Sequence, residues 1–395
     1  MKVKGMLPMG RQNSSIPLCV AAFFQMVGVG LIVALLPSRV IDLSGSMGQV
    51  GYLASAFAVP FVLLQLPVGH LGDRYGFKPF LMAGYLIAAM TGLLYFRAEN
   101  VWSLLGGRIL QGIGEIPVWA LAPALLSLIY PLSKGEAIGK YNASIHLGLT
   151  VGSLLSVFVY TVWRGNEAFL LYAVCGLTGA VIVGLFVREP FSSLERSTLE
   201  APTYGKVFHA LKEIRRPAIY AGVCLYGGGY GVFLTVIPGV LLSRKGFAQS
   251  EVGAFFALFY IAISFAQVMG GRISDRRGRD NIMYIGLLMV AAGLAPFMWL
   301  NKILVFVFLF LASCGLGMFC VSSMVLLNDA VPDSLKGSIS GVFYLLWGIG
   351  FFLVPPLIAS TGGFLGYGPV FLLSAGMFLL ELMALRRDPG MDGEV

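Results

Sequence analysis

The stretch GHLGDRYGFK, Gly69–Lys78, joins two long apolar runs through a short, basic, glycine-rich turn. A second turn of the same design, GRISDRRGRD, occupies Gly271–Asp280. A shift of 202 residues carries Asp73 onto Asp275. The two turns therefore predict that the chain repeats one plan, with a charged turn at an equivalent place in each half.

The sequence around these turns has the composition of an integral membrane protein. It is 57% hydrophobic and 12% charged, with a mean hydropathy of +0.85, whereas soluble domains are roughly 25% charged. A helix needs about 20 apolar residues to cross a bilayer. We find twelve such runs, at residues 17–40, 48–69, 79–97, 101–130, 137–162, 167–187, 217–242, 250–271, 281–300, 303–329, 335–360 and 366–385.

These continuous runs predict an all-α membrane protein with twelve transmembrane helices. Strands could cross a membrane only as a closed barrel, which would show alternating segments of about ten residues. The first run follows Lys2, Lys4 and Arg11, as a signal peptide would. It is too long for a signal peptide and lacks a small-residue cleavage site, so we expect a retained first helix.

Basic residues predict the orientation, because loops rich in Lys and Arg stay in the cytoplasm. With the N-terminus inside, the inner segments hold 20 of the 27 Lys and Arg residues, which also explains the net charge of +8. We expect both termini in the cytoplasm. The organisation follows: a six-helix bundle over residues 1–187, a cytoplasmic linker over 188–216, and a second bundle over 217–395. One helical face in the linker is apolar, so we expect part of it to lie along the membrane; that face holds Tyr204, Val207, Phe208, Leu211 and Ile214.

The 202-residue shift also matches two places outside the turns. It pairs Gln65 with Gln267, and Lys134, Gly135 and Gly139 with Lys336, Gly337 and Gly341. Because the shift spans six predicted helices, both halves keep the same orientation, as in parallel repeats related by an axis along the membrane normal.

The repeated turn resembles the hallmark loop of the major facilitator superfamily of secondary transporters. The matching residues are Gly69, Leu71, Gly72, Asp73, Arg74, Gly76 and Lys78 in the first turn, and Gly271, Asp275, Arg276, Gly278 and Arg279 in the second. Phe77 and Asp280 depart from the pattern. The resemblance implies a cytoplasmic latch that favours the outward-facing form. Topology anchoring alone is the other interpretation of Arg74, Lys78 and Arg276, and Asp333 reads as a local helix cap.

The predicted fourth helix carries the most informative polar residues, in RILQGIGEIPVWALAP. Arg108 and Glu115 are seven residues apart, so they lie on nearly one face, with Gln111 between them. Ionisable groups in a membrane face the bundle interior, not lipid. Glu115 could therefore take up and release a proton as its surroundings change, or it could form a fixed pair with Arg108. Pro117 and Pro123 can bend this helix.

Resemblance to the drug and proton antiporters of that family rests on this helix and the next. Arg108, Gln111 and Gly112 match an Arg-x-x-Gln-Gly pattern, which implies that Arg108 takes part in proton coupling. Gly139, Gly148 and Gly152 match part of a glycine-rich antiporter motif, but close helix packing explains them equally well. His146 is a second proton candidate, with a structural hydrogen bond as the alternative. The candidate substrate-cavity residues are Gln25, Gln65, Gln111, Asn142, Tyr226, Tyr230 and Gln267.

Other functions lack their sequence signatures. No nucleophile and base, metal-ligand cluster or phosphate-binding Gly-Lys-Ser/Thr loop occurs, so we expect no enzyme, no metal, no cofactor and no nucleotide or nucleic-acid partner. The five cysteines, at 19, 175, 224, 314 and 320, read as packing residues. We predict a monomeric, multi-pass inner-membrane transporter that exports small, partly hydrophobic compounds and is driven by a proton gradient. Lipid flipping, or uniport or symport of an organic solute, remains the alternative.

Overall fold

The computed structural model describes residues 15–44, 47–162, 166–190, 202–214 and 216–387, and every regular element within them is helical. The first half contains α1 (Ser15–Ser44), α2 (Met47–Tyr75), α3 (Phe77–Phe96), α4 (Val101–Ile116), η2 (Pro117–Leu121), α5 (Ala122–Ile129), α6 (Lys134–Val162) and α7 (Ala168–Phe186). The linker holds α9 (Tyr204–Glu213). The second half contains α10 (Ala218–Leu234), α11 (Val236–Arg244), α12 (Gln249–Arg277), α13 (Arg279–Leu294), α14 (Lys302–Asp329), η3 (Asp333–Leu335), α15 (Lys336–Leu365) and α16 (Tyr367–Arg387).

Ten helical stretches of the described chain are long and apolar enough to cross a membrane. Three of these stretches are compound, since α4, η2 and α5 follow one another over Val101–Ile129, α10 and α11 over Ala218–Arg244, and η3 and α15 over Asp333–Leu365. Helices α6 and α13 complete the twelve that the apolar runs predict. Large apolar side chains on the outside of the bundle, such as Leu63, Leu185 and Leu373, are exposed, as expected where lipid replaces water.

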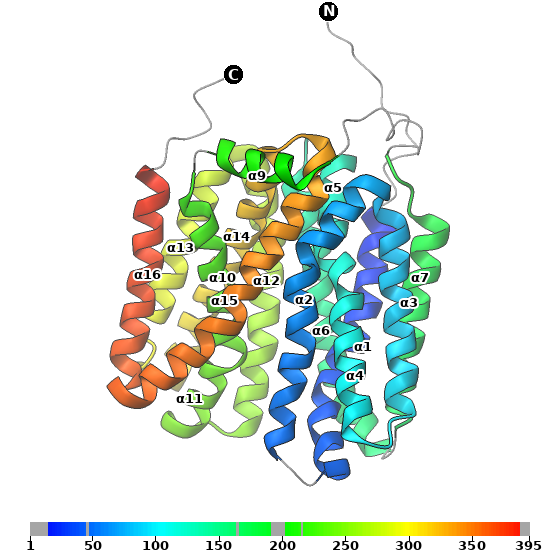
Figure 1. Cartoon of the computed structure of the whole chain (residues 1–395). Coiled ribbons are helices and arrows are strands. Elements are labelled where there is room, and N and C mark those ends of the chain that lie inside the picture. Colours follow the sequence, from blue (N-terminus) through cyan, green and yellow to red (C-terminus); the bar gives the residue numbers. More distant parts are fainter. Residues whose placement is uncertain (1–14, 45–46, 163–165, 191–201, 215, 388–395) are drawn as a thin grey trace, which may run out of the picture.

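The two halves repeat one helix arrangement (Figure 1). Helix α1 packs on α6 and α2 on α4, while in the second half α10 packs on α15 and α12 on α14. Each of these pairs is carried onto its counterpart by the 202-residue shift. The halves lie side by side, with the first half at the right of Figure 1 and the second at the left.

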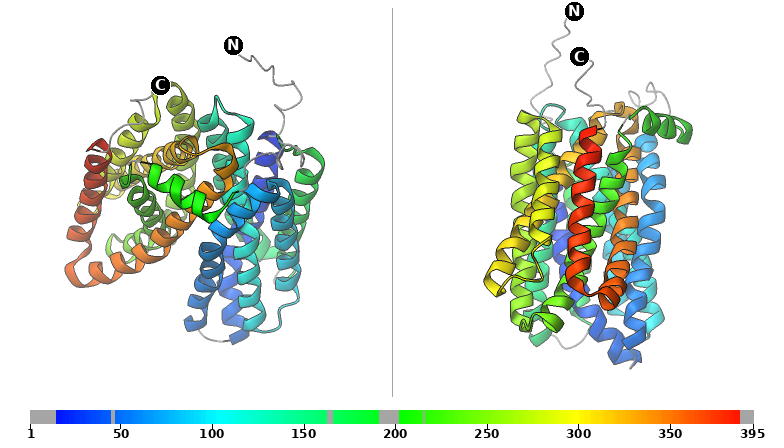
Figure 2. Two further views of the ribbon diagram at one scale, coloured as in Figure 1. Left: turned by 45° about the horizontal axis from the view of Figure 1, so that its top comes forward. Right: turned by 90° about the vertical axis from the view of Figure 1, so that its left-hand side faces the viewer.

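Helices α2 and α15 form one contact between the halves, and α6 and α12 form the other. Figure 1 shows α15 beside α2 at the top and moving away from it toward the bottom. Helix α1 begins, α16 ends and α9 lies at the top (Figures 1 and 2). We call this the cytoplasmic face, following the charge distribution, and the opposite one the outer face. The halves therefore meet at the cytoplasmic face and diverge toward the outer face.

The linker helix α9 contacts both halves at the cytoplasmic face. The Tyr204 ring stacks on His70 of α2, with 4.4 Å between ring centroids. The Tyr220 hydroxyl of α10 donates a hydrogen bond of 2.7 Å to the Leu211 carbonyl. Val207 is buried, as the predicted apolar face requires, whereas Phe208 is exposed. Residues 191–201 and 215 of the predicted linker lie outside the described residues.

Candidate functional site

In each of the two charged turns, a single glycine separates the two helices. Gly76 separates α2 from α3 with a φ of 103°, and Gly278 separates α12 from α13 with a φ of 90°. Residues other than glycine rarely adopt such backbone angles. Both turns therefore need glycine at this point, and both lie at the cytoplasmic face.

Asp73 fastens the end of α2 to the start of α15 in the other half. Its carboxylate accepts hydrogen bonds from the Gly337 amide (2.6 Å), the Ser338 amide (2.7 Å) and the Ser338 hydroxyl (2.6 Å). A Cβ on Gly69 or Gly337 would collide with the carbonyl oxygen of the other, so two glycines allow this approach. We call these four residues the first lock. It satisfies free N–H groups at a helix start with a carboxylate, the arrangement that helix ends favour.

Asp275 makes the equivalent contact from α12 to the start of α6. Its carboxylate accepts hydrogen bonds from the Gly135 amide (3.0 Å) and the Glu136 amide (2.8 Å). A Cβ on Gly271 would likewise collide with the Gly135 carbonyl. We call Asp275, Gly135, Glu136 and Gly271 the second lock. The two locks are related by the 202-residue shift, so the repeat seen in the sequence is also a repeat of contacts between the halves.

Ion pairs surround the second lock. Lys134 of α6 contacts Asp329 of α14 at 2.6 Å, and Arg272 of α12 contacts Glu136 of α6 at 2.9 Å. Both pairs bridge the two halves. Within the second half, Arg279 contacts Asp275 and, at 3.3 Å, Asp329. The sequence repeat pointed to Lys134 only as a matched position, and Glu136, Arg272 and Asp329 were missed because nothing local distinguishes them from other loop charges.

The remaining basic residues of the turns make contacts other than those expected of a latch. Arg74 is exposed, with its guanidinium 5.2 Å from the ring centroid of the adjacent Tyr75. Arg276 is also exposed. Lys78 donates to the Gly184 carbonyl at 2.8 Å, at the end of α7 in its own half.

The prediction that Asp333 caps a helix is wrong. Asp333 lies within η3, 61% exposed, with its carboxylate 3.7 Å from Lys336. Neither η3 nor α15 has a side-chain cap from a neighbouring residue. Asp73, 264 positions before Gly337, takes that role for α15 instead.

A chain of buried and partly buried hydrogen bonds runs along one face of α4. Arg108 donates from Nη1 to Oε1 of Gln111 (2.8 Å), and Gln111 donates from Nε2 to Oε1 of Glu115 (2.8 Å). Trp119, one turn farther on, donates from Nε1 to Oε2 of Glu115 (3.2 Å). Glu115 is 3% exposed. Arg108 and Glu115 thus share the predicted face, and Gln111 joins them where a direct pair would not reach.

Trp119 lies in a π-helical turn, Pro117–Leu121, so the predicted bend in this helix is a change of helix type. Such turns are frequent at functional sites. The Trp119 indole is parallel to that of Trp347 from α15, with 6.3 Å between ring centroids. It packs edge-on against the Tyr344 ring, with 5.7 Å between centroids. The Glu115 chain therefore ends on an aromatic contact between the two halves.

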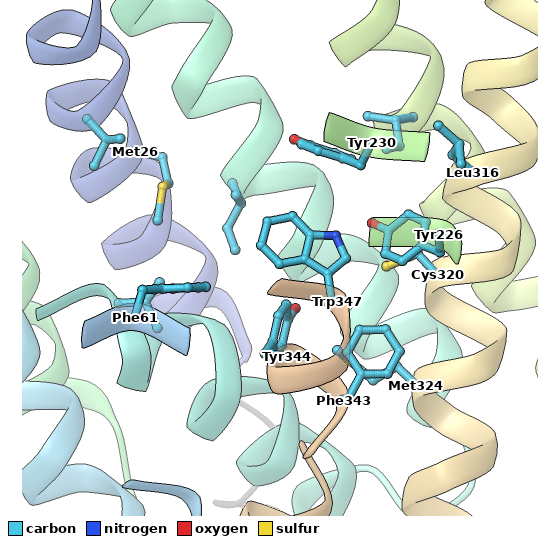
Figure 3. Packing of buried hydrophobic residues seen from close by; sticks show 14 of the residues in the cluster. Met26, Phe61, Tyr226, Tyr230, Leu316, Cys320, Met324, Phe343, Tyr344 and Trp347 are labelled. Carbon is cyan, nitrogen blue, oxygen red and sulfur yellow. The ribbon is translucent and has the colours of Figure 1, made fainter. Parts of the chain in front are cut away.

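Trp347 is the centre of an aromatic cluster between the halves (Figure 3). Phe61 of α2 packs against it at 6.2 Å and Tyr230 of α10 at 5.7 Å. Phe351, one turn along α15, stacks on it at 4.8 Å. Of these residues only Tyr230 was a sequence candidate. The others were missed because aromatic residues within apolar runs look like ordinary core residues.

His146 also connects the two halves. Its Nδ1 lies 2.8 Å from the Asn142 carbonyl, which can only accept, so Nδ1 carries the proton of the neutral ring. Nε2, at 3.2 Å, can then accept from the Tyr230 hydroxyl of α10. These contacts direct His146 to Tyr230 and not to Glu115, with which it was expected to share protons.

The other polar candidates are all buried. Gln25 donates to the Tyr172 hydroxyl at 3.3 Å within the first half. The backbones of Gln65 and Gln267 contact Gly341 and Gly139 of the opposite half. Gly148 and Gly152 pack α6 against the α1 backbone. Tyr226 packs on Phe319 and Phe343 inside the second half.

A cavity of about 790 Å³ lies between the halves on the outer side. Its walls come from the first turns of α2, from the α10–α11 junction, from the outer part of α15 and from the start of α16. Phe351 belongs both to this cavity and to the aromatic cluster. A volume of this size suits a drug-sized compound.

Comparison with known proteins agrees with this geometry. The family model described as Major Facilitator Superfamily matches residues 18–355 and 246–393. The chain belongs to the Major Facilitator Superfamily. It is therefore a membrane transporter, and transporters of this superfamily need no cofactor. The resemblance drawn from the repeated turns, and the twelve-helix fold, are confirmed.

Superfamily relatives of this chain differ in what their names say they transport. Multidrug resistance protein 2 of Bacillus subtilis is 26% identical over 306 residues, which cover 73% of this chain and 75% of that protein. The D-galactonate transporter of Escherichia coli is 22% identical over 372 residues, 85% of each chain. The solved transporter FucP, in an outward conformation, superposes with a TM-score of 0.82 at 14% identity and covers 97% of this chain and 100% of its own. These likenesses establish the family and fold and leave the substrate open.

Proposed function

We propose that this superfamily transporter exports small, partly hydrophobic compounds in exchange for protons, with Glu115 as the proton carrier. The observation that carries the proposal is the hydrogen-bonded chain on α4. Each carboxylate oxygen of Glu115 has its own donor, Gln111 or Trp119. A proton on Oε2 would weaken the hydrogen bond from the Trp119 indole N–H, because a neutral carboxyl oxygen is a weaker acceptor than a carboxylate oxygen. Protonation of Glu115 would thereby act on the Trp119–Trp347 contact between the halves.

The two locks support alternating access by rocking of two six-helix halves, residues 1–187 and 217–395, joined by the linker 188–216. Both locks close the cytoplasmic face while the outer cavity stays open. Contacts present in one state only bias the equilibrium toward that state. We therefore propose that Gly69, Asp73, Gly76, Asp275, Gly278 and Arg279 favour the outward-facing form, whereas Arg74, Lys78 and Arg276 anchor the topology.

A partly hydrophobic substrate fits the centre of the molecule better than an organic anion does. Arg108 would be the counter-ion for an anion, but its guanidinium donates to the Leu53 carbonyl (3.1 Å) and to Gln111, and lies over the Phe57 ring (5.0 Å). Using it for an anion would break these contacts. The aromatic cluster around Trp347 instead offers stacking surfaces that tolerate many apolar molecules.

Other parts of the proposal follow the same geometry. His146 holds Tyr230 and is a second group whose protonation would change a contact between the halves. Gly139, Gly148 and Gly152 let α6 move as a rigid element against its neighbours. We place the transporter in a prokaryotic inner membrane. We also propose that it functions as a monomer, because each chain supplies both halves of the pathway.

Proton flux in liposomes tests the proposal. The full chain is reconstituted in acid-loaded vesicles, and lipophilic cations, uncharged drugs and organic anions are added in turn. We expect substrate-triggered proton release that Glu115→Gln abolishes. Glu99→Gln, the same change at an exposed residue, should leave the release intact. Substrate transport that is unchanged by Glu115→Gln and by collapse of the pH gradient would contradict proton exchange through Glu115 and favour uniport or lipid flipping.

A further inference from the structure

We propose that the outer cavity is a substrate site that opens sideways to the outer leaflet and takes uncharged lipophilic compounds. The inference deepens the proposed export function, since it names the substrate class and the route of release. It rests on the lining, depth and connections of the cavity.

The cavity lining, as far as the structure describes it, has no group that could neutralise a substrate charge. None of the described side chains that form its walls is acidic or basic. Two of its hydroxyl groups are engaged within their own helices, since Thr235 donates to Gly231 and Ser243 to Gly239, both at 2.7 Å. A charged ligand would lose its hydration without gaining a partner. Even the membrane-insertion scales with the smallest penalties put the cost of an unpaired charge at about several kcal/mol. The walls therefore select uncharged molecules.

Hydrogen-bond acceptors are nevertheless available on the α15 wall. Pro355 and Pro356 lie inside this helix. Proline has no N–H, so the carbonyls four residues earlier, of Phe351 and Phe352, lack their usual helical donors. Both of these residues line the cavity. The Phe351 carbonyl packs against Gly231 of α10, so a lipophilic compound with one hydroxyl or amide N–H could use the Phe352 carbonyl, which gives the site a preference among uncharged molecules.

The cavity lies at the depth of lipid chains. Ala54 and Val59 of α2 are seven and twelve residues after its outer end at Met47, or about 10 and 18 Å along the helix. Helices α2 and α15 have 29 and 30 residues, so each extends beyond the roughly 30 Å of hydrocarbon by several ångströms at both ends. The site thus falls within the outer leaflet.

The rim of the cavity is apolar and exposed on the outside of the bundle. Val59, which lines the cavity, is 58% exposed, and Leu63 and Leu357 near it are exposed as well. Helices α2 and α15 lie on the side of the molecule that faces the viewer in Figure 1, and they diverge toward the bottom of the view. An apolar rim at this depth favours release into lipid over release into water.

A series of side-chain contacts connects the cavity to the proposed proton site. Phe351 in its wall stacks on Trp347, which in turn lies parallel to Trp119. Trp119 donates to Glu115. A compound that leaves the aromatic cluster can therefore move along Phe351 into the cavity while Glu115 takes up its next proton.

Cysteine labelling in lipid nanodiscs tests the sideways opening of the cavity. Val59→Cys, in the full chain, is treated with a lipid-soluble maleimide or with a charged, water-soluble one, and labelling of the parent is subtracted as the background from its own cysteines. Leu63→Cys is the lipid-facing control and Glu99→Cys the water-facing control. We expect Val59→Cys to behave like Leu63→Cys. Rapid labelling by the charged reagent, as at Glu99→Cys, would show a water-filled vestibule and overturn the lateral route.

Protection by ligand tests the substrate class. Uncharged drugs from the transport panel should slow labelling of Val59→Cys, whereas permanently charged drugs should not. Ala58→Trp, which fills the cavity, should weaken this affinity at least about tenfold, equal to about 1.4 kcal/mol, and Leu63→Trp should not. Protection by charged drugs alone would overturn the inference. Since labelling needs no proton gradient, protection that persists with Glu115→Gln separates this result from the fate of the coupling mechanism.

Discussion

The first and second locks share a backbone design but differ in their surroundings. In both, an aspartate in the last turn of one helix accepts amide hydrogen bonds from the start of a helix in the other half, and two glycines allow the approach. Asp73 is buried, with 5% of the residue exposed, and the side chain of Asp275 is 8% exposed. Among the contacts described, Asp73 is bound by backbone amides and the Ser338 hydroxyl, whereas Asp275 also contacts the Arg279 guanidinium.

The difference can be traced to positions related by the 202-residue shift. Phe77 corresponds to Arg279, and Ser338 corresponds to Glu136. Phe77 is 1% exposed, while the side chains of Arg279 and Glu136 are 20% and 28% exposed. The comparison teaches that the closing device consists of glycine, aspartate and a helix start, and that the surrounding side chains decide whether water and salt can reach it.

Exchanging Phe77 for arginine should break the first lock most severely. Phe77→Arg would remove a buried ring beside the α15 start, at a cost of about 3–5 kcal/mol, the range for losing a buried phenylalanine side chain. Thermal unfolding of the purified protein measures the loss. The reverse change, Arg279→Phe, removes partly exposed ion pairs and should cost about 1 kcal/mol or less. Equal losses from the two changes would contradict the difference between the locks.

The next largest effect should come from the aspartates themselves. Asp73→Asn would set an amide N–H₂ against one of the two backbone N–H groups that now donate to the carboxylate, and would shift the equilibrium toward the inward-facing form by about 2–3 kcal/mol, the range for hydrogen bonds to charged groups. Asp275→Asn should shift it by only about 1 kcal/mol, because the Lys134–Asp329 and Arg272–Glu136 pairs still bridge the halves.

Spin labels at the cytoplasmic face measure these shifts. Leu132→Cys and Arg386→Cys place labels on exposed residues of opposite halves, and pulsed dipolar spectroscopy gives the populations of short and long distances. Asp333→Asn is the matched control on the same face, since its carboxylate is mostly exposed. A larger shift from Asp275→Asn than from Asp73→Asn would reverse the proposed ranking.

Much of the fold could be predicted from the sequence because its signals are local. Twelve apolar runs, the basic turns and the positive φ of Gly76 and Gly278 depend on short stretches of chain. The Arg108–Gln111–Glu115 alignment could be predicted for the same reason, since helix periodicity alone puts these side chains on one face.

Contacts between distant segments could not be predicted in this way. Asp333 is a good local candidate for a cap, but Asp73 reaches the same helix start from the other half, and only the packed bundle shows this. Trp119 and Trp347 gain their importance from stacking across the halves, which leaves no trace in their own apolar runs. The repeat did contain one unused clue, because the matched positions at 135 and 337 are the ones that the two aspartates bind.

The smallest expected effect is the response to salt, which should come from the second lock alone. Raising ionic strength from 0.1 to 1 M shortens the screening length from about 10 to 3 Å. The partly exposed Lys134–Asp329 and Arg272–Glu136 pairs bridge the halves and should weaken, and the spin-label populations should move toward the inward-facing form by up to about 1 kcal/mol. Arg272→Gln should reduce this response, while Asp73→Asn should keep it, because the contacts described for Asp73 are to backbone amides and a buried hydroxyl. A salt response that is lost with Asp73→Asn, or unchanged by Arg272→Gln, would mean that the two locks do not differ in their access to solvent.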